Sequence, residues 1–176
     1  MTWQDQFPDV SKIIKEQITL HSETFCIDEL MDELYIYTMR QLQNHDKLDV
    51  GVEILNHSDF EKCRIFADRM CLRQILVLLL IHAVKSTESG CIFLGFQTVK
   101  TNRIKFYVED MGDYIPENQL QQIFRQSKHN VQYDKHPELF VSRELIQLMG
   151  GKLNIKSSGT GAIFSFSFAC NPCEIT

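Results

Sequence analysis

The sequence lacks a hydrophobic run long enough to cross a membrane. Its longest apolar stretch covers residues 75–83, includes His82, and is far shorter than the roughly 20 residues of a membrane-spanning helix. The N-terminal residues also lack the basic start and the apolar core of a signal peptide. We therefore expect no direct membrane insertion and a cytoplasmic location, either as a free protein or as the cytoplasmic part of a membrane-anchored parent.

A second cysteine pair and a basic stripe are also missing. Cys170 and Cys173 form a lone C-x-x-C pair, and a zinc knuckle would need a second ligand pair near it. We therefore expect free thiols in a reducing compartment and no metal site. The net charge of -5, with no basic stripe interleaved with aromatic residues, argues against a nucleic-acid partner.

The composition is that of an ordinary globular protein. The 176 residues are 44% hydrophobic and 23% charged, which suits one domain with a short helical lead-in. Apolar residues recur at helical spacing in some segments and alternate in others. Helices are predicted at 9–22, 25–43, 69–86, 116–126 and 137–149, and strands at 50–55, 64–67, 91–99, 103–109, 152–156 and 162–169. This order predicts an α+β fold in two layers, with helices packed on one face of a mixed, mostly antiparallel sheet.

Three motifs carry a resemblance to a known family. The buried helix that follows Asp68, the segment Val108-Glu-Asp-Met-Gly-Asp-Tyr-Ile-Pro116, and the pair Gly150-Gly151 followed by Gly159 and Gly161 occur in a characteristic order and spacing. They resemble the ATP-binding domain of two-component sensor histidine kinases, of the GHKL or Bergerat-fold ATPases. The resemblance implies a dimerisation-type helix ending within residues 1–22, the ATPase domain at 23–170 and a tail at 171–176.

The first motif departs from the family where phosphate and magnesium would bind. Two asparagines four residues apart face the phosphates in the family, and here they align with Leu78 and His82. Magnesium prefers hard oxygen ligands, so leucine offers nothing and imidazole is a poor substitute. For His82 we expect a buried, hydrogen-bonded imidazole; the alternative is a phosphoacceptor or metal ligand. Lys85 matches a position that can reach phosphates, and it equally suits a lysine complementing the helix dipole.

The second motif is partly kept. Asp110 and Gly112 match the family aspartate that accepts a hydrogen bond from the adenine amino group and the glycine beside it. Tyr114 replaces the second glycine, and we expect its ring to plug the site; stacking on a base is the alternative. Without a ligand, Asp110 would cap the turn before Pro116.

The third motif, a glycine-rich lid whose amides wrap the phosphates, aligns with Asp134-Lys-His-Pro-Glu138 and has lost every glycine. Pro137 removes an amide donor, and Asp134 and Glu138 add negative charge where phosphate would sit. No phosphoacceptor motif precedes Ser11. The chain is therefore an excised domain, borrows an acceptor, or uses none.

These departures predict a degenerate two-component kinase domain, a pseudokinase with no catalytic residue, in which ATP and Mg²⁺ binding is weak or lost. Whether it retains any transferase activity stays open at this point. It would act through contacts with the dimerisation and phosphoacceptor helices of a sensor kinase, or with a response regulator. The alternatives are a competent kinase domain that phosphorylates a histidine on a separate or upstream dimerisation domain, and a magnesium-independent binder of an adenine-like ligand. The nucleotide-binding positions, kept or vestigial, are Asp110, Gly112, Lys85, His82, Leu78 and Tyr114.

Overall fold

The computed structural model describes residues 18–57, 62–99, 102–125, 136–170 and 173–174. Its helices are α2 (Ile27–Asn44), α3 (Arg69–Ser86), α4 (Glu117–Arg125) and α5 (Pro137–Leu148). Its strands are β1 (Glu23–Cys26), β2 (Val50–His57), β3 (Cys63–Ala67), β4 (Gly90–Val99), β5 (Arg103–Asp110), β6 (Asn154–Ser158), β7 (Gly161–Ala169) and β8 (Cys173–Glu174).

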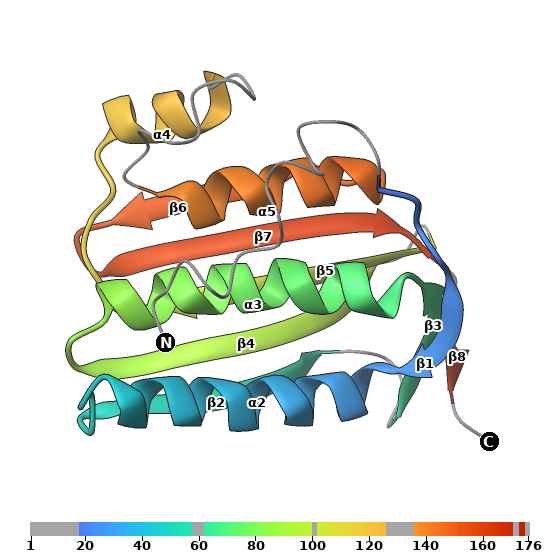
Figure 1. The fold of residues 1–176 in the computed structure, drawn as a ribbon, viewed down its shortest axis with the longest axis horizontal. Coiled ribbons are helices and arrows are strands. Elements are labelled where there is room, and N and C mark those ends of the chain that lie inside the picture. The colour runs from blue at the N-terminus through green and yellow to red at the C-terminus, as the bar shows by residue number, and fades with distance from the viewer. Residues whose placement is uncertain (1–17, 58–61, 100–101, 126–135, 171–172, 175–176) are drawn as a thin grey trace.

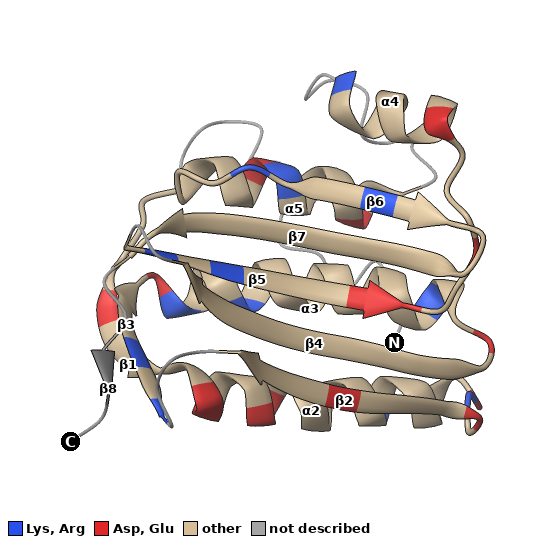
Figure 2. Cartoon of the chain, turned by 180° about the vertical axis from the view of Figure 1, so that it is seen from behind, with Lys and Arg blue, Asp and Glu red and all other residues tan. Residues whose placement is uncertain are grey.

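A five-stranded sheet in the order β2-β4-β5-β7-β6 forms one layer. The β2–β4 pair is parallel and the other three pairs are antiparallel. Helices α2, α3 and α5 lie side by side on one face of this sheet (Figure 1), and Figure 2 shows the sheet in front of them when the molecule is turned round. The predicted two-layer α+β fold with a mixed, mostly antiparallel sheet is confirmed.

A small second sheet, in the order β1-β3-β8, was not expected in this form. The sequence predicts a helix from Phe25. In the structure Phe25 belongs to β1, where it pairs with Ile65 of β3, and the helix begins at Ile27. Tertiary pairing with β3 overrides the local helical pattern of these residues. Two residues of the segment expected to be a tail form β8. Of the helix predicted at 9–22, residues 9–17 lie outside the described chain and residues 18–22 are not helical.

Helix α3 is the central element of the helical layer, packed between α2 and α5. Asp68 caps its N-terminus, because the side chain accepts a hydrogen bond from the Cys71 amide at 2.8 Å. Most of its side chains are buried, as its nearly continuous apolar sequence predicts. Glu33 of α2 accepts hydrogen bonds from Arg69 and Arg73 of α3, so the two helices are also joined by charge.

The C-terminus of α3 is capped from outside the helix. Nζ of Lys47 donates to the carbonyl oxygens of Val84, Lys85 and Thr87 at 2.8, 3.1 and 2.9 Å, and it pairs with Glu88. A lysine here satisfies carbonyls that have no partner within the helix and complements the negative end of the helix dipole.

Within the part of the chain that the structure describes, no helix is long and apolar enough to cross a membrane.

Substituting Lys47 is expected to destabilise the fold. In Lys47→Met the three carbonyls lose a charged donor, and we expect the free energy of unfolding to fall by about 1–3 kcal/mol in urea denaturation. Lys152→Met, at an exposed lysine just before β6, is the matched control and should change it little. Equal losses in the two variants would contradict the capping role.

Candidate functional site

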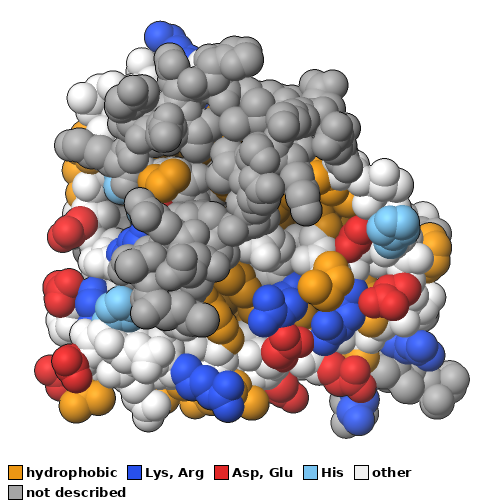
Figure 3. All heavy atoms as spheres, in the orientation of Figure 1, with side chains coloured by type: hydrophobic (Ala, Val, Ile, Leu, Met, Phe, Trp, Pro, Cys, Tyr) orange, Lys and Arg blue, Asp and Glu red, His pale blue; other side chains and the backbone are white. Residues whose placement is uncertain are grey.

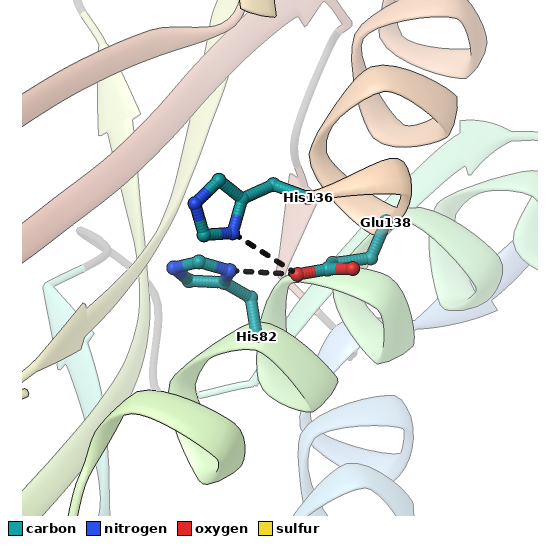
Figure 4. A group of neighbouring side chains, drawn as sticks. All are labelled: His82, His136 and Glu138. Atoms are coloured by element: carbon teal, nitrogen blue, oxygen red, sulfur yellow. Dashed lines mark hydrogen bonds and ion pairs between the residues drawn. The ribbon is translucent and has the colours of Figure 1, made fainter. Parts of the chain in front are cut away.

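The candidate site lies where α3 meets the first turn of α5. Nδ1 of His82 lies 2.8 Å from Oε1 of Glu138, and the two side chains are only 4% and 1% exposed. Nδ1 of His136, the residue just before α5, lies 3.8 Å from the same carboxylate oxygen. Figure 4 shows both rings turned toward Glu138. The expectation that His82 is a buried, hydrogen-bonded imidazole is therefore confirmed.

Aromatic packing fixes the His82 ring in place. Its ring meets His136 edge to face, with centroids 5.1 Å apart, and meets Phe164 of β7 in the same way at 5.0 Å. The ring is thus held between the sheet and the start of α5. Its orientation toward Glu138 is set by packing as well as by the hydrogen bond.

Glu138 is a buried carboxylate that remains charged. Burial by itself would raise its pKa, but the facing rings of His136 and His82 and the charge of Lys85 hold the pKa well below its usual range. Nζ of Lys85 lies 3.4 Å from Oε2, the second oxygen of the carboxylate. Lys85 therefore points toward this anion, and its place in the last turn of α3 also lets its charge complement the helix dipole.

A cavity of about 480 Å³ opens beside this group of charges. His82, His136 and Glu138 line it together with Lys85, and Tyr114 lines another side. The expectation that Tyr114 plugs the site is wrong, because its side chain is 54% exposed and lines the cavity without filling it. Leu78 is fully buried in the hydrophobic core and offers no group to the cavity.

Asp110 lies at the end of β5 and is 2% exposed. Its Oδ1 accepts a hydrogen bond from the Gly112 amide at 2.8 Å, which is the turn-capping role expected in the absence of a ligand. Its Oδ2 is buried and has no hydrogen-bond partner among the described residues. Burial raises the pKa of this carboxyl group. The residues that line the cavity do not include Asp110.

Gly112 is required by a close approach of two backbone segments. A Cβ atom at this position would lie 2.6 Å from the carbonyl oxygen of Ser86, at the end of α3. The glycine thus lets the loop after β5 pack on the helix that carries His82. Its retention has a structural cause that is independent of any ligand.

The structure brings four of the sequence-predicted positions into one neighbourhood, namely His82, Lys85, Gly112 and Tyr114, and leaves Leu78 and Asp110 buried beneath the surface. Sequence reasoning identified Glu138 as a misplaced charge and missed that it pairs with His82 across two helices. It also missed His136 as a partner. The available signal was the replacement of two lid glycines by one basic and one acidic residue. Asp134 lies outside the described residues.

The buried pair is expected to contribute to stability. Glu138→Ala would leave the His82 ring without its partner, and breaking such a buried pair costs on the order of 3–5 kcal/mol. Urea denaturation would measure the loss. The matched control Glu53→Ala, at an exposed position of β2, should change the free energy of unfolding by less than about 1 kcal/mol. A Glu138→Ala variant as stable as this control would show that the pair contributes nothing.

Comparison with known proteins supplies a family. The model for histidine kinase-, DNA gyrase B- and HSP90-like ATPases matches residues 67–172. The circadian input-output histidine kinase CikA of Synechococcus elongatus is 31% identical over 166 residues, covering 89% of this chain and 21% of CikA. The hybrid signal transduction protein dokA of Dictyostelium discoideum is 28% identical over 173 residues, covering 90% of this chain and 10% of dokA.

Solved structures share the fold. Full-length ShkA in complex with AMPPNP superposes with a TM-score of 0.75 at 24% identity, over 93% of this chain and 34% of ShkA. The histidine kinase ThkA in complex with the response regulator protein TrrA gives 0.67 at 23% identity, over 90% of this chain and 46% of that chain. The chain thus spans 10% and 21% of the length of the two curated relatives above.

Proposed function

Because the chain belongs to the family of histidine kinase-, DNA gyrase B- and HSP90-like ATPases, we propose that it is a two-component sensor ATPase domain that has lost most or all nucleotide binding. On this proposal it acts through protein contacts. The single observation that carries the proposal is the buried contact between His82 and Glu138.

That contact joins two positions that the family uses for its ligand. By the motif alignment, His82 stands where an asparagine coordinates magnesium and Glu138 stands where a lid glycine faces phosphate. Here the two side chains contact each other at 2.8 Å, and Lys85 faces the same carboxylate at 3.4 Å. Glu138 thus provides an internal anion for the groups that would otherwise receive a phosphate.

The charges on this side of the cavity do not fit Mg-ATP. A buried, ionised carboxylate repels a triphosphate, and the cavity has neither of the two asparagine side chains that hold it in the family. A hydrogen bond to a charged group contributes about 1.5–3 kcal/mol, so two lost contacts cost about 3–6 kcal/mol. That corresponds to an affinity weaker by roughly a hundred- to ten-thousand-fold.

The partners proposed are those of a sensor kinase. ThkA was solved with a response regulator, and the motif before β1 is similar to the end of a dimerisation helix, so we propose both kinds of contact for this chain. Phe66 of β3 and Met70 of α3, which are 65% and 67% exposed, offer apolar surface at the end of the molecule where β1 begins. Elsewhere on the helix-covered face basic and acidic side chains lie next to one another (Figure 3). The proposed location is cytoplasmic.

Titration calorimetry tests the loss of nucleotide binding. We expect no saturable heat for ADP or a non-hydrolysable ATP analogue up to millimolar concentration, with or without Mg²⁺. In Glu138→Gln the charge is removed at nearly constant shape, and any residual affinity should rise relative to the unchanged chain. Micromolar, magnesium-dependent binding to the unchanged chain would refute the proposal and leave a competent kinase domain.

A second candidate function rests on Asp110. Its Oδ2 is buried without a hydrogen-bond partner among the described residues, so it is an acceptor to which an adenine amino group could donate. A purine-like ligand bound without magnesium would satisfy it. Adenosine that binds as tightly as ADP, and that no longer binds to Asp110→Asn, would establish this function in place of the first. Asn retains an acceptor for Gly112, so the turn should persist.

A further inference from the structure

We propose that His82, His136 and Glu138 form a binding site for a divalent transition-metal ion of the Zn²⁺ type. Each residue offers one ligand atom, and these atoms all lie within 4.8 Å of one another. They come from two elements that are distant in sequence, the second half of α3 and the start of α5 (Figure 4). The sequence predicts no metal site because nothing in it brings these segments together.

The donor set selects the class of metal. Two imidazole nitrogens with one carboxylate oxygen suit zinc and its neighbours in the first transition row. Magnesium, the ion that the family uses, prefers an octahedron of oxygen ligands and would gain little here. The proposed site therefore differs from the family site in its ligands and in its metal.

The distances are compatible with an ion held between the three ligand atoms. Zinc bonds of about 2.0–2.2 Å place tetrahedral ligands roughly 3.3 Å apart. The nitrogen-to-oxygen distances of 2.8 Å for His82 and 3.8 Å for His136 lie on either side of that value. At 3.8 Å the His136 nitrogen is too far for a hydrogen bond, yet its ring still points at the carboxylate oxygen. One carboxylate oxygen thus faces two ring nitrogens, which is the arrangement that a shared ion requires.

Neighbouring side chains hold the ligands in the required state. Nε2 of His136 lies 3.4 Å from Oε1 of Gln119, and in the metal-bound form the tautomer that donates to Gln119 would leave the Nδ1 lone pair for the ion. The ammonium of Lys85 faces Oε2 of the carboxylate and leaves Oε1 for the ion. An arriving ion would displace the proton that His82 shares with Glu138.

The cavity would give an ion an entry path and an open coordination position. All three ligands line the 480 Å³ cavity, so an ion can reach them and a fourth position would face that cavity. The bound ion would fix the start of α5 to α3. The inference stands whether or not nucleotide binds, because its ligands and its metal are tested without nucleotide.

Metal titration of the whole metal-free chain tests the proposal. We expect about one equivalent of Zn²⁺ by calorimetry and a melting temperature higher by on the order of 5 °C at a hundredfold excess over Kd. Mg²⁺ should do neither. Co²⁺ should give visible absorption typical of nitrogen and oxygen ligands, without the near-ultraviolet band of a cobalt thiolate.

Variants locate the ion. His136→Ala removes a partly exposed ligand outside the helix body, so it should fold, and Zn²⁺ affinity should fall at least roughly tenfold. Glu138→Gln should weaken binding similarly. The control His57→Ala, at an exposed histidine of β2, should leave the affinity unchanged. Binding that survives in His136→Ala, a cobalt–thiolate band, or no saturable Zn²⁺ binding would each overturn the proposal.

Discussion

The helical layer is organised around one buried charge, the Glu138 carboxylate at the start of α5. An ionised carboxylate that is 1% exposed is tolerated only when its partners compensate for the lost water. His82 provides that compensation from α3, and Lys85 and His136 add to it from either side. The position of α5 against α3 thus depends on electrostatics as well as on apolar packing. The shape of the cavity wall follows from the same contacts.

The contact between His82 and Glu138 joins two positions that bind the nucleotide in the family. A domain that binds a triphosphate needs empty space and unsatisfied donors where the ligand arrives. In this chain the matching side chains satisfy one another, while the glycines that support the fold are kept for packing reasons, as Gly112 shows against Ser86. The proposed loss of nucleotide and the proposed gain of a metal ion are compatible, because a carboxylate that repels phosphate attracts a cation.

Much of this fold could be predicted from the sequence. The α3 helix was predicted at its observed bounds, and β4, β5 and β7 within one residue, because their hydrophobic patterns are long and regular. The strand β1 was missed, since Phe25 and Cys26 pair with β3 through contacts that no local pattern reveals. The candidate site, like the fold, could be predicted only in part. Aligned motifs indicated which family residues Leu78 and His82 replace, but the pairing of His82 with Glu138 depends on how two helices pack.

Helix α3 is capped at both ends by side chains outside the helix. Asp68 directly precedes it, and Lys47 belongs to the loop after α2. Asp68 bonds the Cys71 amide at the start, and Lys47 bonds three carbonyls at the end. A shift of the helix along its axis would break the three Lys47 bonds, and it would also pull the Asp68 carboxylate away from the His21 amide, which donates to it at 2.7 Å. Conformational change in this domain is therefore expected to leave α3 as the stationary reference and to move α5 and the α4 segment relative to it. His82 would then stay in place, and movement of α5 would make or break its contact with Glu138.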